Sequence, residues 1–149
     1  MHLAERLPRN RDLTIVTNSL GIAMLVTQHP NLSLYLLGGR IRGRTLAAVG
    51  SWVTDALQDV FVDVAFIGTN GLSVEHGLTT PDQSEAAAKR AMIKSARRSV
   101  VLTDHTKIGV DHFSRFADLS DIAAVITDDG LDPETAAEIE ALGPEVVLA

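Results

Sequence analysis

The sequence predicts an α/β protein with a mostly parallel sheet and helices on both faces. Short runs rich in Val, Ile and Leu alternate along the chain with segments of helical length, as successive β–α–β crossovers require. Hydrophobic residues make up 46% of the chain and aromatic residues only 4%, so the core must consist of Ala, Val, Leu and Ile. Such a core is typical of parallel strands that are buried on both faces. The length of 149 residues fits one domain, 1–149.

The first half of the chain predicts two strand–helix pairs. The β-branched run Leu13–Thr17 predicts a strand, and the following Asn18-Ser19 predicts the cap of a helix over Leu20–Gln28. A second strand is expected over Leu32–Leu37, which ends at Gly38-Gly39. A second helix is expected over Leu46–Asp59, despite the glycine within it. Residues 1–8 resemble the end of a helix.

The second half predicts strands and helices in the same alternation. Val62–Ile67 predicts a third strand, and a loop leads from it to Thr80-Pro81-Asp82-Gln83, a capping box with proline at the first helical position. That helix is expected to run to about Arg98. The remaining expected elements are a strand at Ser99–Thr103, a helical turn near Phe113–Phe116, a strand at Ile122–Thr127, a helix from Asp132-Pro133-Glu134 and an edge strand at Glu145–Leu148.

The composition excludes several classes of function. The net charge of −6 disfavours direct contact with a DNA backbone. The chain has no cysteine, and its five histidines are scattered, so we expect no metal site and no cofactor. Neither a signal peptide nor an apolar run of roughly 18 residues is present, so a cytoplasmic protein without membrane contact is expected.

Small and polar residues follow the predicted strands, where open α/β sheets bind their ligands. They are Thr17, Asn18 and Ser19 after the first strand, Gly38, Gly39 and Arg40 after the second, Gly68, Asn70 and Gly71 after the third, and Asp104 and Lys107 after the fourth. Backbone N–H groups with Lys and Arg suit an anion, and Asn and Thr suit sugar hydroxyls. The alternative is that the Gly and Asn residues only form the turns.

Glu85 and Lys89 lie one helical turn apart on the predicted long helix. They form either an ion pair, worth about 0.3–0.5 kcal/mol at this spacing, or an acid and a base that face a ligand. The spacing alone favours the ion pair. We predict no catalytic residue, and the sequence has no G-x-S-x-G nucleophile motif.

The stretch Gly71–Gly109 carries three motifs in succession: G-L-T-T-P, then E-A-A-A-K-R-A-M-I, then a strand that ends D-H-T-K-I-G. Together with Thr14–Ser19 and Leu37–Arg40, it resembles the C-terminal sensor domain of DeoR-family transcriptional regulators. The resemblance covers nearly the whole chain. It implies a fold similar to ribose-5-phosphate isomerase and glucosamine-6-phosphate deaminase.

The resemblance also implies a function. Such domains bind phosphorylated sugars or related metabolites, form dimers or tetramers, and alter the operator affinity of an attached helix-turn-helix, as in a repressor. The implied ligand residues are Thr17, Asn18, Gly38, Gly39, Gly68, Asn70, Gly71, Glu85, Lys89, Asp104 and Lys107. This chain contains no basic helix-turn-helix. The family's D-S-G-T-T phosphate loop is expected before residue 1, so we expect the first strand and that loop to be missing.

Two alternatives to a sensor remain open. One is a sugar-phosphate isomerase or deaminase, which needs a carboxylate base. The isomerases carry a D-G-A-D-E type motif where this chain has Ile67–Gly71, without an acid, so we predict that it is not an enzyme. Glu85 remains a possible base. The other alternative is a fragment that only assembles into oligomers.

Overall fold

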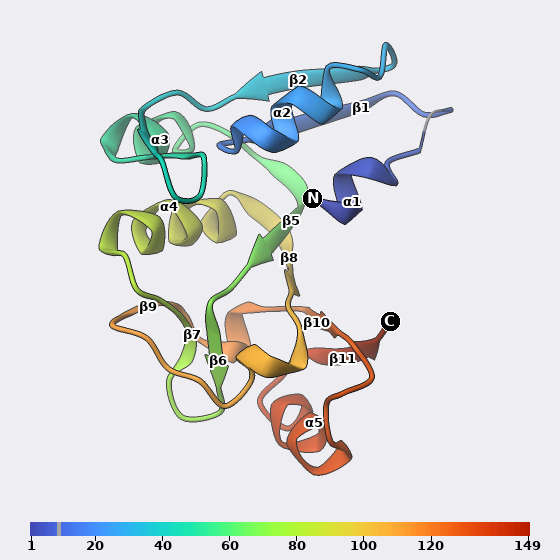
Figure 1. Ribbon diagram of the computed structural model, residues 1–149, viewed down its shortest axis with the longest axis vertical. Helices are drawn as coiled ribbons and strands as arrows, with labels where there is room; N and C mark the ends of the chain where they lie inside the picture. Colours follow the sequence, from blue (N-terminus) through green and yellow to red (C-terminus); the bar gives the residue numbers. More distant parts are fainter. Residues whose placement is uncertain (9) are drawn as a thin grey trace. The chain divides into compact units, whose positions relative to one another are not determined.

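The computed structural model describes residues 1–8 and 10–149, which form two compact units, 1–56 and 57–149 (Figure 1). Both units are built from alternating strands and helices, as the sequence predicted. The expectation that the whole chain is one sensor domain without its first strand stays a prediction.

The first unit contains a pair of parallel strands and a short hairpin. A short helix α1 (His2–Glu5) precedes β1 (Leu13–Thr17), α2 (Leu20–Val26) and β2 (Leu32–Leu36). β1 and β2 are parallel, with Leu13 beside Leu32 and Thr17 beside Leu36. The predicted cap of α2 is confirmed, because the Ser19 hydroxyl accepts a hydrogen bond from the Ile22 N–H at 3.3 Å.

The predicted helix over 46–59 is wrong in its first part. This stretch instead begins with β4 (Ala47–Val49), which pairs antiparallel with β3 (Arg40–Arg42), and only Ser51–Ala56 form the helix α3. The break lies at Gly50, whose φ of +100° is in the left-handed region, and Leu46 also has a positive φ, of 52°. A helix cannot continue through a residue in that conformation, so the chain turns between β4 and α3.

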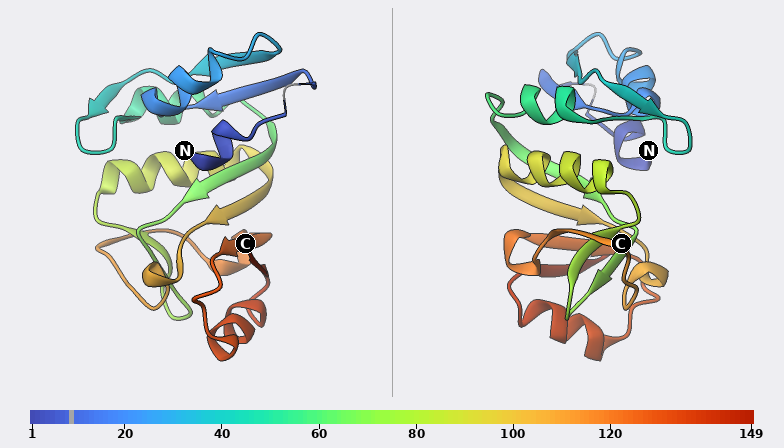
Figure 2. Two further views of the ribbon diagram at one scale, coloured as in Figure 1. Left: turned by 45° about the vertical axis from the view of Figure 1, so that its right-hand side comes forward. Right: turned by 90° about the vertical axis from the view of Figure 1, so that its left-hand side faces the viewer.

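The second unit contains a four-stranded parallel sheet with helices packed beside it (Figure 2). The strand order is β11-β10-β8-β5, with bounds Glu145–Leu148, Ala124–Thr127, Ala96–Leu102 and Val62–Gly68. The helices α4 (Gln83–Lys94) and α5 (Pro133–Glu140) contribute Ala86 and Ile139 to the hydrophobic core. The prediction of an α/β fold with a mostly parallel sheet is therefore confirmed, and β11 lies at the sheet edge as expected.

A second, antiparallel sheet lies in the same unit, where the sequence predicted a loop and a helical turn. It consists of β6 (Gly71–Ser73), β7 (Gly77–Thr80) and β9 (Ser114–Ala117), in the order β6-β7-β9. The helical turn predicted near Phe113–Phe116 is wrong. Thr80 pairs with Ser114 across β7 and β9, and Phe116 is buried in the core, so tertiary pairing determines the conformation of this short segment.

The long helix α4 is shorter than predicted at both ends. Its N-cap is Asp82, whose side chain accepts a hydrogen bond from the Glu85 N–H at 2.9 Å, so Pro81 precedes the helix. At the other end the chain enters β8 at Ala96, which pairs with Val62 of β5. Residues 96–98 extend a strand that was expected to begin at Ser99, because β5 offers them hydrogen-bond partners.

Among residues 1–8 and 10–149, no helix combines the length and the apolar composition that crossing a bilayer requires.

Two glycines with similar backbone conformation offer a test of the packing of β7 against β9. Gly77 and Gly109 have φ values of +69° and +79°. A Cβ at Gly77 would collide with the carbonyl oxygen of Ala117, whereas a Cβ at Gly109 would meet no atom within 4 Å. Both Gly109→Ala and Gly77→Ala should lose about 1–2 kcal/mol to backbone strain. Gly77→Ala should lose about 1–3 kcal/mol more to the collision. Urea unfolding measures both, and equal losses would contradict the rigid contact.

Candidate functional site

The β5–β8 register brings two predicted groups of site residues to one edge of the sheet. Gly68 at the end of β5 pairs with Leu102 at the end of β8. Asn70 and Asp104 each lie two residues beyond that pair, and Lys107 ends a short 3-10 helix η1 (His105–Lys107) that follows. The carboxyl ends of adjacent parallel strands are where open α/β sheets bind ligands.

The predicted residues Glu85, Lys89 and Lys107 lie within electrostatic reach of one another. Burial lowers the pKa of the half-buried Lys89, because an ammonium loses hydration there. Glu85 acts in the opposite direction and raises the pKa of Lys89, while the ammonium of Lys107 lowers it further. Lys89 thus experiences the charge of a carboxylate on its own helix and that of an ammonium on η1, which makes the three residues one candidate site.

Lys89 also makes a cation–π contact with an aromatic ring. Its Nζ lies 5.1 Å from the centroid of the Phe116 ring, which is buried in the core. A cation over a ring face at this distance is attracted by the ring quadrupole. Arg90 fixes the same helix to β9, because its Nη2 donates a hydrogen bond to the Arg115 carbonyl oxygen at 2.7 Å. β9 therefore serves as a platform for the Lys89 side chain.

A buried hydroxyl connects Asn70 with Glu85. The Thr80 Oγ1 lies 2.9 Å from Asn70 Oδ1 and 3.3 Å from Glu85 Oε2. Thr80 is fully buried and Glu85 is 8% exposed, whereas Asn70 reaches the surface. A surface amide and a buried carboxylate thus share one hydroxyl donor.

The loop between η1 and β9 holds the backbone around Asn70. The Gly109 N–H donates to the Leu72 carbonyl oxygen at 2.8 Å, and the His112 N–H donates to Thr79 Oγ1 at 3.0 Å. The His112 ring Nε2 lies 3.2 Å from the Asn70 carbonyl oxygen. Because a carbonyl only accepts, Nε2 must carry the proton in this bond. At Gly71 the Val110 carbonyl approaches so closely that a Cβ would collide with it, so only glycine fits there.

Asp104 and Asp128 hold η1 in place. Asp104 accepts hydrogen bonds from Thr106, which lower the pKa of Asp104, and its Oδ2 lies 3.0 Å from Lys107 Nζ. His105 pairs with Asp128 at 2.9 Å, and this hydrogen bond raises the pKa of His105. These two contacts attach η1, which ends at Lys107, to the residues that follow β8 and β10.

The predicted residues of the first unit gather at the ends of β1 and β2, and most support the local fold. The Thr17 hydroxyl accepts from the Ser19 N–H at 3.1 Å, and Asn18 Nδ2 donates to the Ala48 carbonyl oxygen at 2.8 Å. Gly39 has a φ of +145°, and Arg40 begins β3 with an exposed side chain. Gly38, which precedes Gly39, is exposed. The structure thus brings the predicted residues together in two groups, one in each unit.

Sequence reasoning missed Thr80, His112 and Phe116. Thr80 was assigned to the start of the helix, His112 was discounted because the histidines are scattered, and Phe116 was placed in a helical turn. Thr80 and Phe116 lie in the paired strands β7 and β9, and the His112 N–H donates to Thr79 of β7. No local pattern encodes these long-range contacts. Within the described residues, no cluster of three or more His, Asp or Glu side chains could hold a metal ion.

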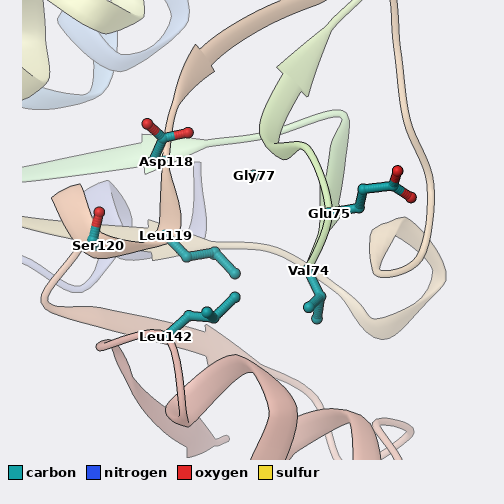
Figure 3. Close-up of a pocket in the computed structure, with 7 residues that line it drawn as sticks. All are labelled: Val74, Glu75, Gly77, Asp118, Leu119, Ser120 and Leu142. Carbon is teal, nitrogen blue, oxygen red and sulfur yellow. The ribbon is translucent and has the colours of Figure 1, made fainter.

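A small cavity of about 180 Å³ lies elsewhere in the second unit (Figure 3). It is lined by Val74, Glu75, Gly77, Asp118, Leu119, Ser120 and Leu142, and none of these is a predicted site residue. Figure 3 shows Leu119 and Leu142 extending toward each other across it. Its volume is below the roughly 300 Å³ at which ligand pockets begin, so the strand-end residues remain the candidate site.

The shared electrostatics of the site can be tested through the pKa of Lys89. Lys107→Ala should raise the Lys89 pKa because a repelling cation is removed, and Glu85→Gln should lower it because an attracting anion is removed. Lys94→Ala, an exposed position at the end of α4, is the matched control and should leave it unchanged. The pH titration of the Lys89 Cε resonance by NMR measures all three. An unchanged Lys89 pKa in Lys107→Ala would show that the two lysines do not share a site.

The sequence pattern described as the DeoR C terminal sensor domain matches residues 1–129. The HTH-type transcriptional regulator GlpR of Haloferax volcanii is 38% identical over 147 residues, 99% of this chain and 57% of that protein. The HTH-type transcriptional repressor GlcR of Bacillus subtilis is 37% identical over 117 residues, 78% of this chain and 45% of that protein. The putative aga operon transcriptional repressor of Escherichia coli O157:H7 is 25% identical over 146 residues, which are 98% of this chain and 54% of that protein.

The chain spans about half the length of the curated relatives it matches, and the three named above are transcriptional regulators or repressors. The family's pattern covers both units, and the motifs that suggested it, from Gly71 to Gly109, lie within the matched residues. The chain therefore belongs to the family of DeoR C-terminal sensor domains.

Proposed function

We propose that this chain binds a phosphorylated sugar or a related anionic metabolite and transmits its presence to an attached helix-turn-helix. The observation that carries the proposal is a pair of lysines: Lys107 ends η1, which follows the end of β8, and its charge acts on Lys89 of α4, whose Nζ lies over the Phe116 ring. Two ammonium groups at a strand end suit a phosphate, which each can contact as a point charge. The family to which the chain belongs supports a sensing role.

The proposed contacts of this ligand are the predicted site residues of the second unit. Lys89 and Lys107 bind the anion, Asn70 contacts an oxygen of its phosphate, the Gly68 and Gly71 backbone contacts the sugar, and Asp104 and Glu85 position the lysines. The predicted residues of the first unit form a separate group whose ligand contacts stay a prediction: Thr17, Asn18, Ser19, Gly38, Gly39 and Arg40.

The regulatory output is proposed from the relatives. They are named HTH-type regulators, and this chain matches about half of each. DNA contact would therefore come from a helix-turn-helix domain and not from this chain, whose net charge of −6 repels phosphates. We propose that the domain forms a dimer or tetramer, and that the ligand favours one subunit arrangement and so shifts operator affinity.

We propose that the site binds without turnover. An isomerase needs a carboxylate that reaches the carbon next to a carbonyl, and Asn70 cannot take a proton. Of the two acids of the site, Asp104 is paired with Lys107 at 3.0 Å, and Glu85 is buried and lies 3.3 Å from the Thr80 hydroxyl.

Binding without turnover predicts that the protein does not catalyse proton exchange in a sugar phosphate. In deuterated water, ¹H NMR of ribose 5-phosphate and glucose 6-phosphate should show no protein-dependent loss of the proton next to the carbonyl carbon. Ribose-5-phosphate isomerase is the positive control. Exchange above background that disappears in Glu85→Gln would overturn the sensor-only proposal and assign Glu85 as a base.

Thermal unfolding against a panel of triose, pentose and hexose phosphates tests the binding itself. A ligand at 100 times its Kd stabilises the folded state by about 2.7 kcal/mol, which raises Tm by several degrees in a domain of this size. Lys107→Ala should weaken binding about 10–100-fold, since a hydrogen bond to a charged group contributes about 1.5–3 kcal/mol.

Lys94→Ala is the control for this experiment, because it removes a lysine from the same unit without touching the site. It should bind like the wild type. Equal binding by Lys107→Ala and the wild type would show that the ligand site lies elsewhere.

A further inference from the structure

The Thr80 hydroxyl has one proton and two oxygen neighbours that accept. Asn70 Oδ1 is 2.9 Å away and Glu85 Oε2 is 3.3 Å away. Thr80 has no exposed surface, so water does not compete for its proton. The hydroxyl therefore donates to one of the two protein oxygens, and the shorter distance selects Asn70.

Asn70 is fixed in its backbone as well as in its side chain. The His112 ring donates to the Asn70 carbonyl oxygen at 3.2 Å, and the Thr69 hydroxyl donates to the Gly71 carbonyl oxygen at 2.7 Å. With the backbone held, the main freedom left to Asn70 is rotation of its terminal amide. The two orientations of an amide differ in which of Oδ1 and Nδ2 faces outward, and hydrogen bonding decides between them.

We propose that Thr80 is a positioning residue that determines the specificity of the ligand site through Asn70. By donating to Oδ1, the Thr80 hydroxyl directs the Asn70 Nδ2–H₂ group outward, where it acts as a donor to the ligand. This inference rests on the proposed function, since it assumes that the strand-end site binds a ligand.

The consequence is a site that presents donors. Besides the Asn70 amide, the site contains the ammonium groups of Lys89 and Lys107, which only donate. Of its two acids, Asp104 is paired with Lys107 at 3.0 Å, and Glu85 is buried beside the Thr80 hydroxyl. The matching ligand atom at Asn70 is an oxygen that accepts, such as a carbonyl, a hydroxyl or a phosphate oxygen. A ligand group that only donates would face the Asn70 amide hydrogens. The site therefore selects a ligand oxygen that accepts over a ligand ammonium at the position that contacts Asn70.

Thr80→Val tests the inference, because it removes the donor and keeps the β-branched shape. The probe is inorganic phosphate, titrated while the side-chain amide resonances of Asn70 and the Tm are followed. Thr80→Val should bind phosphate about 3–10-fold more weakly than the wild type, in line with the net contribution of one hydrogen bond. Thr80→Ser retains a hydroxyl and should restore binding.

A double-mutant cycle separates positioning from a general loss of structure. In an Asn70→Ala background, Thr80→Val should have no further effect on phosphate binding, because the amide that it orients is absent. A structural defect would instead lower binding in both backgrounds. The Tm of each variant without phosphate shows whether it is folded at the temperature of the titration.

The outcomes distinguish the inference from the proposed function. If the wild type binds phosphate and Thr80→Val binds equally well, or loses affinity also in the Asn70→Ala background, the role of Thr80 is overturned and the sensor proposal stands. If the wild type binds neither inorganic phosphate nor any member of the sugar-phosphate panel, the proposed function fails and this inference fails with it.

Discussion

The parallel pairing of β5 with β8 is the constraint on which the rest of the second unit depends. Its register runs from Val62 beside Ala96 to Gly68 beside Leu102, so both strands end at the same level. The chain must then leave the sheet at that edge twice, once into the β6–β7 hairpin and once into η1. Asn70 and Lys107 lie on these two exits, although they are far apart in the sequence.

The charged groups around Lys89 oppose one another in their effect on its ammonium group. Lys89 is half-buried on a core aromatic ring, beside one acid and one further cation. Burial makes its charge costly, and Lys107 adds to the cost, while Glu85 offsets part of it. A ligand with negative charge would stabilise both ammonium groups, whereas a neutral or cationic one would not. This electrostatic balance supports the proposal that the ligand is an anion.

Local patterns predicted the fold well where the structure is local. β1 and β11 have the predicted bounds, and the caps Ser19 and Asp132 begin helices because a side-chain oxygen and the following N–H groups are neighbours in sequence. Prediction failed where distant pairing decides the conformation. Phe116 lies in a strand because β7 pairs with β9, and β8 begins early because β5 is beside it. The candidate site divides in the same way: the motifs supplied Lys89 and Lys107, but only the packed sheet associates Thr80 and His112 with Asn70.

The net negative charge of the chain and its local pair of lysines have opposite effects on large and small anions. A nucleic acid meets the charge of a whole face, and a net charge of −6 opposes its approach. A small phosphorylated molecule interacts mainly with the groups that it touches, because salt screens charges beyond about 8–10 Å. Two ammonium groups within that range can therefore bind a small anion while the remaining surface repels a polyanion. This separation supports the proposal that the domain binds a small anion and that a helix-turn-helix domain contacts the DNA.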